Sequence, residues 1–249
     1  LADHTVFISH WLKTLNIYQK NKPSSVILNG ADEKVFNDSE NRIWVKGEPV
    51  KIVTHHWSSN KMKGFDVYEK LDQLIISDEW RGKIEFTYIG NIPKGFNFKN
   101  TKIIKPLSGK KLAKELSNHH VYITASNNEP AGMHHIEGVL TGLPIIYKNS
   151  GALPEYCKDF GVSFNSLDFI PALDQMIKNY HFYKSNLKNY SNTASKMSLE
   201  YVCLFKELID KKKNIVSNRR LFRSPINILK NFIFFVMYSK KILKLLVKK

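Results

Sequence analysis

The stretch EPAGMHHIEGVLTGLPIIYKNSGALPEY, residues 129–156, decides the fold. It predicts a helix that begins at Pro130, because the missing N–H of a proline would have no partner at the first helical position. The helix is expected to end at Gly142, a residue typical of helix ends. A short apolar strand, 144–147, follows at once, and the chain turns again at Gly151. A helix joined directly to a buried strand indicates a repeated β-α unit.

The same alternation runs along most of the chain and predicts an α/β fold. Short β-rich segments separated by helices indicate a Rossmann-like parallel sheet covered by helices on both faces. The strands are expected at 5–9, 25–28, 51–57, 84–90, 102–105, 120–126, 144–147 and 161–164, and the helices at 65–75, 108–117, 131–142, 173–183 and 194–209. Ligands of such sheets bind where the strands end at their carboxyl edge.

The helix after Pro130 is placed to bind an anion. Its first amides point forward without partners, at the positive end of the helix dipole, which favours phosphate. Gly132 allows a ligand to approach the backbone next to Met133. Glu129 and Glu137 are separated by eight positions, roughly 12 Å of helix. Two carboxylates at this separation can accept hydrogen bonds from the two ends of a sugar–diphosphate–ribose unit, although two surface charges at this spacing are common.

This glutamate pair, followed by a strand and by a turn that ends in Glu155, resembles the carboxyl-terminal half of a family-4-type retaining GT-B glycosyltransferase. The resemblance extends over about residues 5–205 and is carried by an ordered set of segments. These segments are SSVILNGADEKVF (24–36), KIVTHHWSSNKMKGFDVYEKL (51–71) and SGKKLAKELSNHHVYITASNNEP (108–130).

The resemblance implies a role for each residue of the predicted site. Lys63 would contact the diphosphate of a nucleotide-sugar donor of the UDP or GDP type, and Glu137 would hold its ribose hydroxyls. Glu129 would bind the transferred sugar and act as the catalytic residue, and the amides near Gly132 and Met133 would complete the phosphate cradle.

One departure from the family pattern concerns the phosphate site. The arginine that usually precedes the Lys-Gly pair is missing between positions 51 and 63, and Lys61 is the candidate for the second positive charge. A lysine cannot make the bidentate contact of an arginine. The sequence contains no Asp-x-Asp pair, which fits chemistry without a metal or any other cofactor.

Several other residues attract attention without predicting a site. The three His-His pairs, 55–56, 119–120 and 134–135, do not predict a metal site, since neighbouring side chains diverge on a strand and on a helix. The first and third of these pairs are expected near the mouth of the site. Trp57 is expected in the core or at the rim, and Glu155 near the turn beside the sugar. Cys157 and Cys203 predict two reduced, partly buried thiols rather than a disulfide framework.

The charge of the chain is concentrated at its end. The net charge is +16, but twelve of the 38 lysines and arginines and none of the 22 acidic residues lie in 211–249. The body is therefore nearly neutral, which argues against a nucleic-acid partner. The tail predicts a basic amphipathic helix on an anionic membrane surface, or one that packs on an amino-terminal domain. Its longest apolar run, 232–238, is too short to cross a bilayer.

Three regions are expected. Residues 1–40 would be the end of an amino-terminal acceptor domain that is mostly missing, 41–210 the donor-binding domain, and 211–249 the basic tail. The predicted function is metal-independent transfer of a sugar, with retention, to a glycan or lipid-linked acceptor in polysaccharide biosynthesis. The protein would be cytoplasmic and peripheral on the membrane, and the fragment alone would be inactive. The alternatives are a nucleotide-sugar epimerase or a phosphorylase on the same fold, or a non-catalytic membrane-associated scaffold.

Overall fold

The computed structural model describes residues 2–15, 22–219, 228–230 and 232–237. Its centre is a six-stranded, wholly parallel sheet with the order β5-β4-β3-β6-β7-β8. The strands are β3 (Val50–His56), β4 (Ile84–Gly90), β5 (Lys102–Ile104), β6 (Val121–Thr124), β7 (Ile145–Lys148) and β8 (Gly161–Phe164). The predicted α/β Rossmann-like fold is confirmed.

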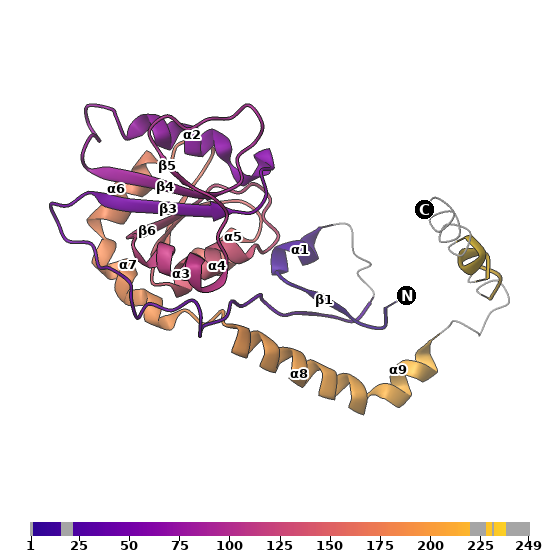
Figure 1. Ribbon diagram of the computed structural model, residues 1–249. Coiled ribbons are helices and arrows are strands. Elements are labelled where there is room, and N and C mark those ends of the chain that lie inside the picture. The colour runs from indigo at the N-terminus through magenta and orange to yellow at the C-terminus, as the bar shows by residue number, and fades with distance from the viewer. Residues whose placement is uncertain (1, 16–21, 220–227, 231, 238–249) are drawn as a thin grey trace.

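Helices cover both faces of this sheet, as Figure 1 shows. One face packs on α2 (Phe65–Leu74) and α6 (Ile170–Lys178), and the other packs on α3 (Gly109–Ser117), α4 (Met133–Leu140) and α5 (Leu153–Cys157). Successive side chains of a strand point to opposite faces, so Ile52 enters the first core and Val53 the second. Because both faces are covered, every residue of β3 except the half-buried Lys51 is buried, including Thr54 and both histidines.

A small parallel pair precedes the main sheet. It consists of β1 (Thr5–Phe7) and β2 (Ser24–Val26), with α1 (His10–Thr14) between them. Residues 34–49 form no helix or strand, and Trp44 within them is buried against Tyr180. The remaining elements are the 3-10 turns η1 (Lys61–Lys63) and η2 (Leu187–Asn189), and the helices α7 (Tyr180–Asn186), α8 (Ala194–Asp210) and α9 (Lys212–Asn218).

Contacts with α5 attach the β1–α1 segment to the main domain. The Glu155 carboxylate accepts hydrogen bonds from the amides of His10 (2.8 Å) and Trp11 (2.6 Å), at the amino end of α1. The Tyr156 hydroxyl donates to the carbonyl of Ile8 at 2.6 Å. Glu155, which was expected near the turn beside the sugar, therefore caps the amino end of α1.

The buried carboxylate of Asp72 anchors the loop before β5. It accepts hydrogen bonds from the amides of Lys99, Asn100 and Thr101 and from the Thr101 hydroxyl. Burial alone would raise the pKa of Asp72, but these hydrogen bonds outweigh it and lower the pKa below its usual value. One α2 side chain therefore fixes the course of the chain between β4 and β5.

Three expectations about the chain differ from the structure or lie outside it. α4 begins at Met133 and not at Pro130, because Gly132 is extended (φ −65°, ψ 153°) and serves as the N-cap. Cys157 is buried, whereas Cys203 is exposed on α8. Most of the predicted tail helix, 224–227, 231 and 238–249, lies outside the described residues.

Candidate functional site

The residues singled out from the sequence meet at the carboxyl edge of the sheet. β3 leads into η1, β6 leads through the loop 125–132 into α4, and β7 leads into the turn before α5. β3, β6 and β7 are neighbours in the sheet, so their following loops lie together. This is the edge at which open α/β sheets bind their ligands.

Lys63 and Glu129 form a direct ion pair across this edge. The Nζ of Lys63 donates a hydrogen bond to Oε2 of Glu129 at 2.7 Å. The Glu129 side chain is only 6% exposed and that of Lys63 is 23% exposed. A carboxylate this far from water needs a charged partner, and here the lysine supplies it. The two residues predicted for the diphosphate and for the sugar thus hold each other.

Backbone contacts fix the loop that carries Glu129. The Asn127 amide donates to the Met62 carbonyl of η1 (2.7 Å), and the Ala152 amide donates to the Glu129 carbonyl (2.8 Å). Gly151 has a φ of +64°, and a Cβ there would lie 2.4 Å from the Glu129 backbone. Only glycine fits this turn against the loop, which accounts for the Gly-Ala-Leu-Pro-Glu sequence.

The amino end of α4 opens toward Glu129. The amides of Met133 and the next two residues belong to the first turn, where N–H groups have no partner inside the helix. A Cβ on Gly132 would lie 2.6 Å from Nδ1 of His134 and 2.9 Å from the Glu129 carboxylate, so a larger residue would have to displace these side chains. The carbonyl of Ala131 accepts a hydrogen bond from Asn29 at 2.9 Å. That contact helps to keep the segment before Met133 out of the helix.

Glu137 has a partner that the sequence did not indicate. Its Oε2 lies 2.8 Å from Nε2 of His55, at the end of β3. A carboxylate only accepts hydrogen bonds, so Nε2 carries the hydrogen. The other ring nitrogen lies 3.1 Å from the Tyr122 hydroxyl, and this relay from β6 through β3 fixes the direction of the Glu137 carboxylate.

The other histidines near the site are buried and uncharged at neutral pH. Burial, with the nearby Lys63 charge, holds the pKa of His56 well below its usual range. Burial likewise lowers the pKa of His134, and lowers that of His135 to about 3. His56 lies 2.8 Å from the Tyr68 hydroxyl, whereas both ring nitrogens of His135 lack partners among the described residues. The imidazoles expected at the mouth therefore lie beneath it, in the core.

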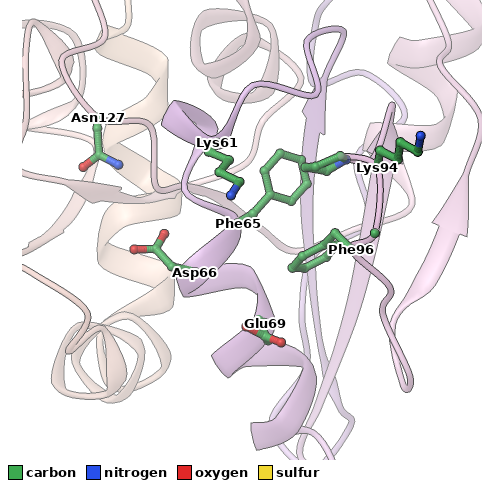
Figure 2. A pocket seen from close by; sticks show the side chains of 9 residues that line it. Lys61, Phe65, Asp66, Glu69, Lys94, Phe96 and Asn127 are labelled. Atoms are coloured by element: carbon green, nitrogen blue, oxygen red, sulfur yellow. The ribbon is translucent and has the colours of Figure 1, made fainter.

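Lys61 does not join the Lys63–Glu129 pair. It lines a separate pocket of about 490 Å³ together with the start of α2, the β4–β5 loop and Asn127 (Figure 2). Trp57, between β3 and η1, is 65% exposed, so it is a rim residue and not a core residue. Among the described residues, no group of three or more His, Cys, Asp or Glu side chains could hold a metal ion.

The sequence missed the His55–Glu137 contact and the pocket at Lys61. The position of His55, on a strand end at the ligand edge, was the one signal available for the first. Nothing in the order of residues indicated that Phe96 would lie beside Phe65, with ring centroids 5.1 Å apart.

Comparison with solved structures identifies proteins of similar fold. A sucrose-phosphate synthase from Thermosynechococcus elongatus superposes with a TM-score of 0.66 over 84% of this chain and 59% of its own, at 16% identity. The pneumococcal O-GlcNAc transferase GtfA, solved with UDP and GlcNAc, superposes with a TM-score of 0.63 over 84% of this chain and 46% of its own, at 13% identity. A glycosyltransferase from Rickettsia africae ESF-5 superposes with a TM-score of 0.60 over 86% of this chain and 64% of its own, at 17% identity.

The fold is that of the carboxyl-terminal domain of GT-B glycosyltransferases. The chain spans less than two thirds of each of these three structures. No protein-family profile matches the sequence, and no curated protein matches it either. Within the part of the chain that the structure describes, no helix combines the length and the apolar character needed to cross a bilayer.

Proposed function

We propose that the chain is the donor-binding part of a glycosyltransferase that uses a nucleoside-diphosphate sugar. The observation that carries the proposal is the row of groups along the carboxyl edge of the sheet. We assign Glu137, which contacts His55, to the ribose, the first turn of α4 and Lys63 to the diphosphate, and Glu129, which contacts Lys63, to the sugar. The GT-B fold supports the proposal, because ligands of such sheets bind at this edge.

The chemistry expected of this site is electrostatic. A departing nucleoside diphosphate gains negative charge, which the amides of Gly132 and Met133 and the ammonium group of Lys63 are placed to stabilise. Lys61, two positions earlier in the same turn, was the candidate for a second positive charge, but its side chain lines the neighbouring pocket. These groups would suffice without a metal ion or an organic cofactor. We propose transfer with retention to a glycan or lipid-linked acceptor, in the manner of the family-4-type enzymes that the sequence resembles.

Thermal unfolding in the presence of nucleotides tests the proposal. A ligand that binds only the native state raises stability by RT ln(1 + [L]/Kd). The melting temperature of the chain should rise with one of UDP, GDP, ADP and CMP, and Glu137→Ala should lose that rise. An unchanged melting temperature with all four would reject donor binding by this chain. Binding without any transfer by the longer protein would favour the non-catalytic scaffold.

A second proposal concerns the basic tail. We infer that residues 211–249 hold the protein on an anionic, cytoplasmic membrane surface. Twelve positive charges without an acidic residue support this, as does the exposure of large apolar side chains such as Phe232 (64%) and Met237 (66%). Deleting residues 214–249 should abolish salt-sensitive sedimentation with vesicles that contain phosphatidylserine. Undiminished sedimentation of the truncated chain would assign the tail to packing within the protein.

A further inference from the structure

The pocket at Lys61 is a second concave site beside the proposed donor site. It lies between the start of α2 and the loop that joins β4 to β5, and its volume of about 490 Å³ is within the range of small-molecule sites. Phe65 and Phe96 form its aromatic side (Figure 2). Phe65 is almost fully buried and supports the half-buried Phe96, so the accessible ring surface belongs to Phe96.

The polar side chains of the pocket are not engaged by the protein. Lys61, Asp66, Glu69 and Asn127 make no side-chain hydrogen bond or ion pair with any described residue. The adjacent Lys63, by contrast, is paired with Glu129. The pocket therefore offers free donors and free acceptors next to an aromatic surface.

This combination fits a saccharide better than an anion or an apolar group. The charges of Lys61 and Lys94 are balanced by those of Asp66 and Glu69, so a phosphate would meet carboxylates as well as lysines. An apolar ligand would remove water from these polar groups without replacing their hydrogen bonds. Sugar hydroxyls both donate and accept, which suits carboxylate, ammonium and amide groups together, and the C–H face of a sugar ring can lie on Phe96.

The pocket lies apart from the groups proposed to bind the nucleotide. Glu137 and His55 lie on the sheet face covered by α4, whereas the pocket borders α2, on the opposite face. Lys61 and Lys63 mark the two ends of one turn, and only Lys63 contacts Glu129. Asn127, which lines the pocket, lies two positions before Glu129 in the same loop, so the pocket borders the loop that carries the residue proposed for the sugar.

We propose that this pocket binds a saccharide unit of the acceptor glycan. The proposal rests on the proposed function, since it takes Glu129 to mark the transferred sugar. It assigns Asp66 and Glu69, two exposed side chains of α2, to acceptor recognition. The donor-binding fold would then contribute to the choice of acceptor.

Saturation-transfer difference NMR on the 249-residue chain tests the pocket directly. The probes are the methyl glycosides of glucose, galactose, mannose and N-acetylglucosamine, each with and without saturating UDP and GDP. At least one glycoside should show saturation transfer that neither nucleotide displaces. The double variant Asp66→Ala/Glu69→Ala should weaken its binding at least about tenfold, because it removes two charged acceptors.

A matched control removes one aspartate and one glutamate elsewhere. Asp78 and Glu79 are exposed, lie outside the pocket and make no interaction with a described residue. Asp78→Ala/Glu79→Ala should therefore leave glycoside binding unchanged. Phe96→Leu, which keeps an apolar side chain but removes the ring, should weaken glycoside binding as well. Melting temperatures without ligand show that each variant is folded.

The outcomes are distinct. Absence of saturation transfer from every glycoside, equal effects of the two double variants, or displacement of the glycoside by UDP or GDP would each overturn the pocket assignment. Donor binding is judged separately, from the melting-temperature rise with nucleotides, which Asp66→Ala/Glu69→Ala should retain. A chain that binds nucleotide but no glycoside thus refutes the pocket alone, and one that binds neither refutes both proposals.

Discussion

Glu129→Gln should strengthen the binding of a bare nucleoside diphosphate and leave the binding of the nucleotide sugar nearly unchanged, so that the preference for the nucleotide sugar falls. The Nζ of Lys63 is held by the Glu129 carboxylate at 2.7 Å. A diphosphate that recruits Lys63 must first break this contact. The glutamine keeps the size of the side chain and still accepts a hydrogen bond, but it removes the negative charge that competes with the phosphates.

The size of the effect follows from the burial of the pair. The glutamine keeps a hydrogen bond from the charged lysine but removes the charge–charge attraction, which contributes about 1 kcal/mol in a partly exposed pair, so release of Lys63 is easier by about 1 kcal/mol. That difference is about a fivefold tighter dissociation constant for the bare diphosphate. A sugar hydroxyl that bonded to the carboxylate loses a similar amount. The nucleotide sugar also gains from the easier release of Lys63, so its two changes offset each other, and the ratio of the two affinities should shift by about fivefold.

Isothermal titration calorimetry with UDP and UDP-glucose, and with GDP and GDP-mannose, measures this ratio. The control is Glu115→Gln, which weakens another glutamate–lysine pair (with Lys102, 3.2 Å) outside the site and should change neither affinity. If Glu129→Gln weakened the diphosphate and the nucleotide sugar equally, Glu129 would not distinguish the sugar, and the division of labour would be wrong.

Three further changes probe the ribose site, the fold and the buried histidines. Glu137→Gln should weaken a bare nucleoside diphosphate about tenfold in the same titration, because the amide loses a charged bond to the ribose; an unchanged affinity would remove Glu137 from the nucleotide site. Asp72→Asn should cost about 2 kcal/mol of unfolding free energy in urea at pH 7. Because the pKa of Asp72 is lowered in the folded protein, its carboxylate stabilises the fold above the usual pKa of an aspartate, and this stabilisation is lost as the pH falls through the pKa of the folded state. The difference in unfolding free energy between wild type and variant should therefore vanish in acid. The pKa of His135 is lowered to about 3, so between pH 6.5 and 3 only the unfolded chain binds this proton, and each unit by which the pH is lowered costs about 1.4 kcal/mol of unfolding free energy. His135→Phe should lose that part of the pH dependence in melts from pH 7.5 to 5. An identical pH dependence in wild type and variant would contradict the burial of His135.

The strands and most helices could be predicted because the turn residues and the pattern of apolar residues indicate the same elements. The expected strand 84–90 and strand 161–164 coincide with β4 and β8, and the other strands differ by one to three residues at their ends. Burial on both faces favours short apolar runs bounded by turn residues, a pattern that can be read from the sequence. The Pro130 signal failed because it is local, whereas the start of α4 depends on Asn29, which holds the Ala131 carbonyl from 102 positions away.

The contacts inside the candidate site could not be predicted for a related reason. Lys63 and Glu129 are 66 positions apart, and His55 and Glu137 are 82 apart. Their distances depend on which strands are neighbours and on their register, and a one-residue shift would turn each side chain to the other face. The residue types and the edge of the sheet could be predicted from the sequence, but the pairing could not.

The way in which the site is supported also bears on how it would respond to a donor. The Glu129 loop is fixed through its backbone, by Met62 on one side and by the Gly151 turn on the other, and Glu137 is fixed by His55. The Lys63–Glu129 contact, in contrast, involves only the ends of two side chains, and the lysine is partly exposed to water. A donor would therefore need to rearrange two side chains and no backbone. Because a rigid loop adds no ordering cost on binding, the affinity difference between a diphosphate and its sugar should report the chemistry of Glu129 and not a movement of the loop that carries it.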